Sequence, residues 1–567
     1  RLSKRAVQER VNETPRGLLE WARGLLQQAG RTSGREATEE DLLAVASGDP
    51  RQRWMARLTG LGDIALEAAG VLGIVNRPVV LEWLLEATRW DEDPFIDAVN
   101  ALIRRGLAHE RPAGGSWGLE LTDREAGEVA WELLSPASRR AAAERFSEVV
   151  GTEHPDHPVA VDERPALLAR AWLKADAPET ALPLLETAAK LEQAAGRTAT
   201  GLAVADLWVN TIRLVGSPSL TTALAIRVAF ASAACEWARA EDDLDEMAEL
   251  AGDVPERQLE VLTARATLYQ HAQDHESVIE TAEEAFRTAL LVDAPRETLF
   301  KLSDLLADVD LQQGHLTNAR DRWLGIANEA RRSAAPFWEM VGRMGSASAD
   351  IQLGEFNAAT DALAKAALLA DDQCDQLNTL VIQMRRAYLL GLRGALESSH
   401  DQLAEVVERA TTLGAVLVIG PAVTFLGQTC RLLERLEDAE VHLERGERVL
   451  RATEQRRTLA VCLSERALVA LGRGDLEAAR NHVAGAGMAA TLTDGVQLER
   501  ERVHCAIGKV AEIIGDRTAL AAARRQTIRS LETQAQLLLP QQLARWVAVS
   551  PRAEVISWAS WTPTVPG

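Results

Sequence analysis

The sequence predicts an all-α protein in which helical hairpins repeat at a fixed interval along the chain. Aromatic residues make up only 4% of the 567 residues. Alanine and leucine fill the interior instead, and the β-branched runs that favour strands are scarce. A single core stops growing at about 250–300 residues, so a chain of this length needs several domains or an extended array. A fixed period in the second half of the chain favours the array.

The period is carried by turn-type residues that recur every 40 positions. They are Asp274, Gly314, Gly354, Gly394, Glu434 and Gly474. Seven residues before each of the last five stands a small residue, another stands five residues after it, and a bulky apolar residue follows four positions later. In one unit these are Ala347, Ala359 and Leu363. The unit around Asp274 matches poorly, with Thr267, Ile279 and Glu283 at these places.

This spacing is typical of two antiparallel helices. A glycine at the turn can adopt the left-handed conformation that ends a helix. The two small residues let the helix backbones approach closely, and the bulky residue lies on the same face as the second small one. Because one hairpin cannot bury its own apolar face, consecutive hairpins are expected to stack.

The order of small, turn, small and bulky residues resembles the tetratricopeptide repeat, in longer units that are similar to those of bacterial regulators of the maltose-activator type. Ala169, Asp176, Ala181 and Leu185 repeat it earlier in the chain. We therefore expect a right-handed superhelix of about eight to ten hairpins over residues 160–540, with a turn near Glu241–Asp243. Residues 541–567 are expected to form a C-terminal tail that is disordered or loosely docked from Pro551 onward.

Residues 51–150 show no such period. Their pattern predicts helices over 54–75, 78–87 and 91–106, then a strand hairpin around Gly114–Gly115, then two helices over 123–150 separated at Ser135–Pro136. The order of three helices and a hairpin resembles a winged-helix domain.

The same region also resembles the segment that follows the nucleotide-binding core in signal-transduction ATPases with numerous domains. The matching stretches are Leu66–Gly73, Leu102–Leu107 and the helix with Arg139 and Arg140. Residues 1–50, through Asn12–Glu20, resemble the last helices of that ATPase's lid. The resemblance implies that this chain is the C-terminal portion of a longer protein. ATP and Mg²⁺ would then belong to a missing N-terminal domain, and this chain itself would hold no cofactor.

Charge argues against nucleic acid and membrane surfaces as partners. The formal net charge is −21, which repels phosphates and anionic lipids at long range. Residues 54–150 hold ten Arg, no Lys and sixteen Asp or Glu, and the third helix opens at Asp91 and Asp93. We therefore favour a structural role for the winged-helix region. The alternative is a transcription regulator that contacts DNA through it.

Localisation is expected to be cytoplasmic. The five cysteines are widely spaced, which suits reduced thiols, and no signal peptide is visible. The uncharged stretch Ala410–Cys430 is in register with the repeat, so we interpret it as a buried repeat helix and not as a membrane span.

No catalytic constellation is evident, so the chain is not expected to be an enzyme. Gly508–Lys509 lacks the first glycine of a phosphate loop, since Val503 stands there. His154 and His157 lie between prolines without a third ligand, which favours a solvated linker over a metal site. His442 and His482 recur at equivalent repeat positions and are expected on helix surfaces.

Surface recognition is the function that remains. In a tetratricopeptide-type array the first helix of each hairpin lines the concave face, which suits a protein or peptide ligand, and self-association is also open. The family's inner positions fall here on Lys301, Asp304, Asp308, Gln312, Met344, Ser348, Gln352, Met384, Tyr388, Thr424, Gln428, Arg431 and Ser464. The resemblance implies a non-catalytic sensor or protein-interaction arm of a larger signalling ATPase. The competing interpretation is that these are ordinary solvated positions.

Overall fold

The computed structural model describes residues 50–113, 116–151, 159–373, 375–491 and 498–563. The predicted lid helices (1–49) and the His154 and His157 linker lie outside these ranges. The chain divides into two compact units, residues 1–188 with 210–217 and residues 189–209 with 218–567, and each is described by itself. Among the described residues, no helix has the length and apolar character needed to cross a membrane.

The first unit contains the hairpin and the second and third helices that the sequence predicts, but the helix predicted over 54–75 is interrupted at residues 59–62 and forms two helices. Its elements are α4 (Pro50–Leu58), α5 (Asp63–Val75), β1 (Val79–Val80), α6 (Leu81–Thr88), α7 (Glu92–Arg104), β2 (Ala108–Ala113), β3 (Ser116–Leu121), α8 (Arg124–Leu133), α9 (Pro136–Val150) and α10 (Arg164–Lys174). β3 is central in an antiparallel sheet of order β1-β3-β2. The sequence pattern does not predict β1, because so short a strand shows no alternation.

The core of this unit forms where α5 meets α8 and α9. Helix α5 is buried along almost its whole length. A Cβ on Gly73 would lie 2.7 Å from the Cα of Gly127 in α8, so glycine at both positions allows this close crossing. The break predicted at Ser135–Pro136 is present: Ser135 caps α9 by accepting a hydrogen bond from the Ser138 amide, and Pro136 is the first helical residue. The winged-helix assignment itself stays a prediction.

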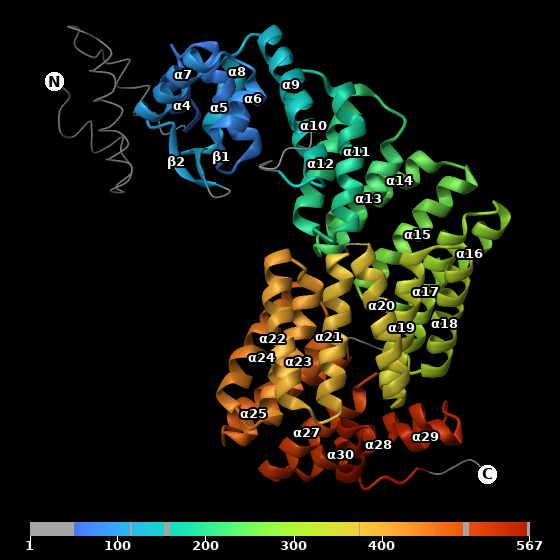
Figure 1. The fold of residues 1–567 in the computed structure, drawn as a ribbon. Helices are drawn as coiled ribbons and strands as arrows, with labels where there is room; N and C mark the ends of the chain where they lie inside the picture. Colours follow the sequence, from blue (N-terminus) through green and yellow to red (C-terminus); the bar gives the residue numbers. More distant parts are fainter. Residues whose placement is uncertain (1–49, 114–115, 152–158, 374, 492–497, 564–567) are drawn as a thin grey trace. The chain divides into compact units, whose positions relative to one another are not determined.

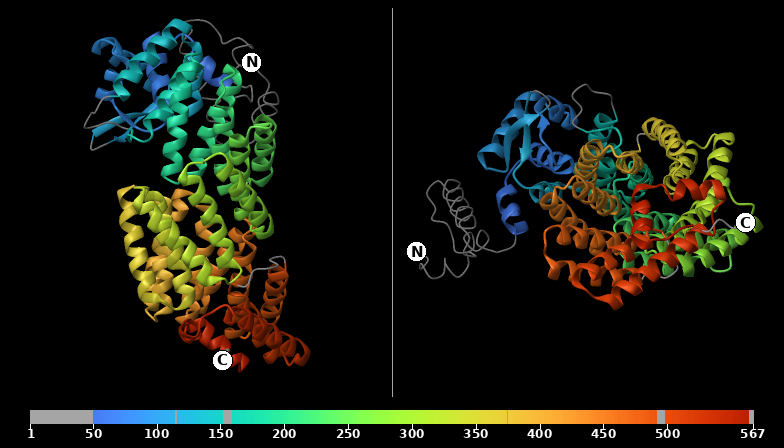
Figure 2. Two further views of the ribbon diagram at one scale, coloured as in Figure 1. Left: turned by 90° about the vertical axis from the view of Figure 1, so that its right-hand side faces the viewer. Right: turned by 90° about the horizontal axis from the view of Figure 1, so that it is seen from below.

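The second unit is an α-solenoid (Figures 1 and 2). Of the helices that follow α10, residues 178–188 and 210–215 belong to the first unit. The helices that follow α10 are α11 (Pro178–Ala194), α12 (Thr198–Val215), α13 (Leu220–Ala233), α14 (Trp237–Ala251), α15 (Pro255–His271), α16 (His275–Leu291), α17 (Arg296–Gln312), α18 (Leu316–Arg332), α19 (Pro336–Leu353), α20 (Phe356–Asp372), α21 (Gln376–Leu392), α22 (Leu396–Leu413), α23 (Val416–Leu432), α24 (Leu436–Ala452), α25 (Arg456–Gly472), α26 (Leu476–Thr491), α27 (Arg500–Ile514), α28 (Arg517–Ala535), α29 (Pro540–Trp546) and α30 (Ser550–Ala559). Within the described ranges, α13 to α28 form eight successive hairpins, and the first helices of neighbouring hairpins also contact each other. The prediction of a stacked helical array is confirmed.

The structural repeat has a half-period, one helix with its turn, that the sequence pattern does not reveal. Left-handed residues occur at the helix ends Gln273, Asp293, Gly314, Ala334, Gly354, Gly394, Gly414, Glu434, Glu454 and Gly474. Most helices between them have the same length, and short turns join them. Turns inside a hairpin and turns between hairpins are therefore alike. Only the inner turn carries a strong sequence signal, because glycine is frequent there.

The poor match around Asp274 is a shift of register by one residue. The left-handed residue of that turn is Gln273. When the positions are counted from Gln273, the two positions usually held by small residues fall on Ala266 and Val278, and the position usually held by a bulky residue falls on Ala282. All three side chains are fully buried. Asp274 instead caps α16 by accepting a hydrogen bond from the Ser277 amide.

The turn predicted near Glu241–Asp243 is wrong. These residues lie within α14, and the turn is at Cys235, whose φ is 62°. Asp243 is buried, and its carboxylate accepts hydrogen bonds of 2.7 and 2.5 Å from Arg227. An acidic run in a sequence suggests a solvated turn. Here Arg227 on the preceding helix neutralises Asp243, so the acidic residue can lie inside a helix.

The expectation of a loosely docked tail is also wrong. Helices α29 and α30 fall in this segment, and Trp546 is fully buried within an apolar cluster. The buried Arg552 donates hydrogen bonds to the carbonyl oxygens of Gln352 (3.2 Å) and Trp546 (3.0 Å). The segment lies outside the 40-residue repeat, so the periodicity that predicts the array gives no signal for this docking.

Glycine 354 provides a test of that docking. Its φ is 77°, and a Cβ there would lie 2.9 Å from the Arg545 carbonyl oxygen. We expect Gly354→Ala to lower the free energy of unfolding by about 1–2 kcal/mol, because alanine is strained in the left-handed conformation. The collision of the new Cβ with the Arg545 carbonyl oxygen should lower it by about 1–3 kcal/mol more. Gly474→Ala is the matched control, since its φ is 78° and its Cβ would meet open space. Equal losses of thermal stability in circular dichroism would contradict the docking.

Candidate functional site

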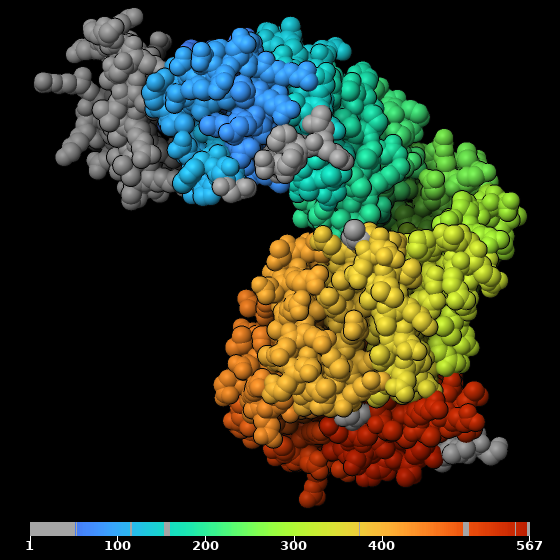
Figure 3. Space-filling view, viewed as in Figure 1, coloured from blue at the N-terminus to red at the C-terminus, as the bar shows by residue number. Residues whose placement is uncertain are grey.

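The first helices of six consecutive hairpins surround a cavity of about 420 Å³ within the second unit. Its helical lining residues come from α15, α17, α19, α21, α23 and α25, and none comes from the second helix of a hairpin. We call it the inner cavity. Because only first helices contribute helical lining residues, the expectation that they line the inside of the array is confirmed. On the face that Figure 3 shows, the surface over the yellow and orange segments is continuous.

Nine of the thirteen predicted contact residues line a cavity. Six of them line the inner cavity, and these are Asp308, Gln312, Ser348, Gln352, Met384 and Tyr388. Gln428, Arg431 and Ser464 line a second, smaller cavity. The inner positions of the family therefore identify the cavity-lining face of these helices.

The other four predicted residues line neither cavity. Thr424 is a correction: it is fully buried, and its hydroxyl donates to the Gly420 carbonyl oxygen at 2.9 Å. Asp304 accepts a 2.7 Å hydrogen bond from Trp323 Nε1 and interacts electrostatically with Lys301. Met344 packs into an apolar cluster. Thr424 lies deeper than expected because side chains from neighbouring helices pack against it, whereas the other three residues are half-buried.

Four charged side chains line the inner cavity, and they differ in how they are neutralised. Arg457 donates to Glu499 at 2.8 Å, and Glu499 also accepts from Arg502 at 2.6 Å. Arg385 donates to the Met344 carbonyl oxygen at 2.8 Å. Asp308 is the fourth charged side chain. Among the described residues, neither Asp308 nor Arg385 takes part in an ion pair. Burial lowers the pKa of Arg385 to about 10, so the guanidinium still carries its charge at neutral pH.

Three side chains of the inner cavity hold an enclosed polar atom without a protein partner. The atoms are Nδ1 of His271, Oε1 of Gln312 and Nε of Arg457, which is already paired through another nitrogen. Burial, together with the charge of nearby Lys301, lowers the pKa of His271 to about 4, so the ring is neutral at pH 7. An enclosed polar atom without a hydrogen bond is costly, and a ligand can supply the missing partner.

An aromatic pair forms one wall of the inner cavity. The rings of Tyr388 and Phe425 stack with their centroids 4.3 Å apart and an interplanar angle of 23°. Burial raises the pKa of Tyr388 to about 12, which keeps the phenol neutral. The cavity therefore combines an apolar wall with a few polar groups, as ligand sites of about 300–1,000 Å³ commonly do.

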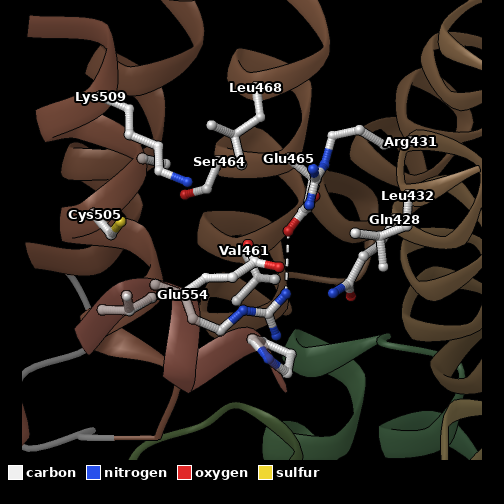
Figure 4. A pocket seen from close by; sticks show the side chains of 14 residues that line it. Gln428, Arg431, Leu432, Val461, Ser464, Glu465, Leu468, Cys505, Lys509 and Glu554 are labelled. Atoms are coloured by element: carbon white, nitrogen blue, oxygen red, sulfur yellow. Dashed lines mark hydrogen bonds and ion pairs between the residues drawn. The ribbon is translucent and has the colours of Figure 1, made fainter. Parts of the chain in front are cut away.

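The smaller cavity, of about 50 Å³, is built around a buried ion network (Figure 4). Glu465 accepts hydrogen bonds from Arg431 at 2.6 Å and from Arg502 at 3.1 Å. Burial alone would raise the pKa of Glu465, but the two guanidinium groups outweigh it and hold the pKa below its ordinary value. The cavity has room for only a few water molecules. Arg431 therefore holds helices together, which differs from the contact role expected for it.

Sequence reasoning missed several residues of the inner cavity. Arg385 follows Met384 directly and precedes Tyr388 by three positions, so helical spacing could have placed it on the same face. His271 is the counterpart of Gln312 in the preceding hairpin, and the register shift in the turn after it hid this equivalence. Gln455 reaches the cavity from a turn, where the periodicity of a helix face gives no signal.

No group of three or more His, Cys, Asp or Glu side chains in the described parts of the chain could hold a metal ion. The described cysteines, Cys235, Cys430, Cys462 and Cys505, are free thiols.

Fold and cavity together define an all-α repeat protein with a partly polar cavity on its inner face. No family model and no curated protein matches the chain. Among solved structures it resembles the APC/C hetero-tetramer Cut9–Hcn1, with 12% identity over 98% of this chain and 99% of that one and a TM-score of 0.45.

Two further solved structures are similar to this chain. One is a Rap protein complexed with competence and sporulation factor, with 11% identity over 60% of this chain and 99% of that one and a TM-score of 0.41. The other is a signal transduction ATPase with numerous domains from Pyrococcus horikoshii, which has a tetratricopeptide repeat sensor. Its identity is 11% over 96% of this chain and 74% of that one, with a TM-score of 0.35. Likenesses this distant carry no argument about what this chain binds.

Proposed function

We propose that this chain is a non-catalytic binding arm that takes a protein or peptide partner into the inner cavity of its repeat array. The observation that carries the proposal is a cavity of about 420 Å³ with an aromatic wall and enclosed, unpartnered polar atoms. Such a site is concave, mostly formed in advance and selective through a small number of polar groups.

The proposal extends to the role of the arm in a larger protein. Binding in the cavity would favour one arrangement of the array, and a signalling ATPase joined to it would respond to that arrangement. This sensor role rests on the resemblance seen in the sequence, and the cytoplasmic location proposed for it rests on the widely spaced cysteines, which suit reduced thiols. DNA recognition through α7 is not proposed, because Asp91, Glu92 and Asp93 are exposed at its start and repel phosphates.

A displayed library of random 12-residue peptides tests the binding proposal on the full chain. We expect enriched peptides whose affinity falls about 10- to 30-fold in Tyr388→Ala, since buried aromatic anchors contribute about 2 kcal/mol at such sites. Fluorescence anisotropy with a labelled peptide measures the change.

Arg386→Gln is the matched control, because Arg386 is exposed on the same helix as Tyr388. The proposal is wrong if no peptide is enriched, or if the two variants bind the enriched peptides equally well.

A further inference from the structure

Two of the four charged side chains that line the inner cavity form no ion pair among the described residues. Arg457 and Glu499 neutralise each other, as described above. Arg385 on α21 and Asp308 on α17 take part in no ion pair among the described residues, although both line the same cavity. Both side chains are half-buried, and a charge that is partly removed from water is costly to leave without an ion-pair partner.

Asp308 and Arg385 are close enough to interact through space but form no ion pair with each other. Burial lowers the pKa of Arg385, and the charge of Asp308 opposes part of that lowering. Helix α19 stands between α17 and α21 in the sequence of first helices, and its Ser348 and Gln352 line the same cavity. The space between an anion and a cation that do not meet suits a ligand that carries both opposite charges.

None of the neighbouring acids and bases in the described ranges forms an ion pair with Asp308 or Arg385, although Asp304 acts on Arg385 and Asp308 acts on His275 through space. Trp323 already donates to Asp304, and Lys301 interacts electrostatically with the same carboxylate. His271 is neutral, as argued above. The groups that remain for a ligand are therefore one carboxylate, one guanidinium and the enclosed acceptor Gln312 Oε1, which lies one helical turn beyond Asp308.

We propose that the inner cavity binds a small zwitterion, with its ammonium group on Asp308 and its carboxylate on Arg385. An amide N–H of the ligand would donate to Gln312 Oε1, and an apolar side chain would lie against Tyr388 and Phe425. Short peptides with free termini and free amino acids share this chemistry. The inference rests on the proposed function and specifies the ligand class of the same cavity.

Pools of random tetrapeptides in four terminal forms test this inference. The forms are free, N-acetylated, C-amidated and doubly blocked, and a pool of free amino acids forms a fifth arm. Affinity selection on the full chain with mass spectrometry measures which pools are retained. We expect each single block to weaken retention roughly 10- to 100-fold, because it removes a charge-assisted hydrogen bond in an enclosed site.

Charge-removing variants assign each terminus to its residue. Arg385→Gln should bind amidated and free-acid pools equally, whereas Arg385→Lys keeps part of the preference for the acid. Asp308→Asn should bind acetylated and free-amine pools equally. Arg386→Gln on α21 and Glu297→Gln on α17 are controls, since both side chains are exposed, and both should keep the full preference of the unaltered chain.

The outcomes separate this inference from the proposed function. Equal retention of all four forms would overturn the zwitterion but leave peptide binding intact, and so would binding of 12-residue peptides without any tetrapeptide or amino acid. Failure of every pool, the 12-residue peptides included, would overturn both. Retention of free amino acids with the same dependence on Arg385 and Asp308 would support the inference and identify the amino acid as the source.

Discussion

Replacing Glu465 by glutamine will lower the free energy of unfolding of the second unit by about 3–5 kcal/mol, because removing one partner leaves a buried guanidinium charge without compensation. Only 6% of the Glu465 side chain is exposed, and only 10% of Arg502. Arg431 loses more of its electrostatic compensation than Arg502 does, because Arg502 keeps its hydrogen bond with Glu499.

The loss will depend on pH in a defined direction. The folded-state pKa of Glu465 is below its ordinary value, so its ionised form contributes stability above the unfolded-state pKa of about 4.3. That contribution disappears as the pH falls through the folded-state pKa. The difference between the unaltered chain and Glu465→Gln is therefore largest at neutral pH and vanishes in acid.

Hydrogen–deuterium exchange with mass spectrometry measures this effect within the second unit. Peptides from α23, α25 and α27 should lose protection together, because the network joins these three helices. Glu444→Gln is the control, since Glu444 is exposed on α24 and should change stability by less than about 0.5 kcal/mol. Equal behaviour of the two variants at neutral pH would contradict the stabilising role of the network.

Replacing Trp546 by alanine will cost about 3–5 kcal/mol, the usual loss for a fully buried tryptophan. Its ring is edge-on to Trp561 at 6.4 Å, and the guanidinium of Arg552 lies 4.2 Å from its centroid. Both contacts disappear with the ring, and α29 and α30 lose their main anchor. We expect residues 540–559 to exchange amide hydrogens rapidly in the variant.

Trp117→Ala is the control for this prediction, because 69% of Trp117 is exposed. It should leave stability within about 0.5 kcal/mol of the unaltered chain. If Trp546→Ala keeps the protection of residues 540–559, the C-terminal helices do not depend on this anchor, and the account of their docking is wrong.

The helical array was predictable from the sequence because its signal is repeated. Small residues recur wherever two helix backbones approach closely, so several weak signals reinforce one another. Structural features that occur only once in the chain have no such repeated signal. The displacement of one turn to Gln273, the buried pair of Asp243 with Arg227 and the docking of Trp546 each occur once. Each depends on a partner that is distant in sequence or on one inserted residue.

The inner cavity was predictable in part for the same reason. The face that carries Asp308, Ser348 and Tyr388 follows from helical periodicity. Which side chains lie in the cavity and which lie under it depends on neighbouring helices. Thr424 lies on the predicted helix but is packed against its neighbours, whereas Gln455 enters from a turn.

The similarity of all the turns constrains how such a chain can grow. First helices face the cavity and second helices do not line it, while each helix with its turn occupies nearly the same length of chain. Gaining or losing one such segment would preserve every local turn, yet it would exchange the roles of all helices downstream and direct the groups that now face the inner cavity outward. Changes in length are therefore expected to be tolerated only in helix pairs, which is why the sequence shows the hairpin, and not the single helix, as its repeating unit.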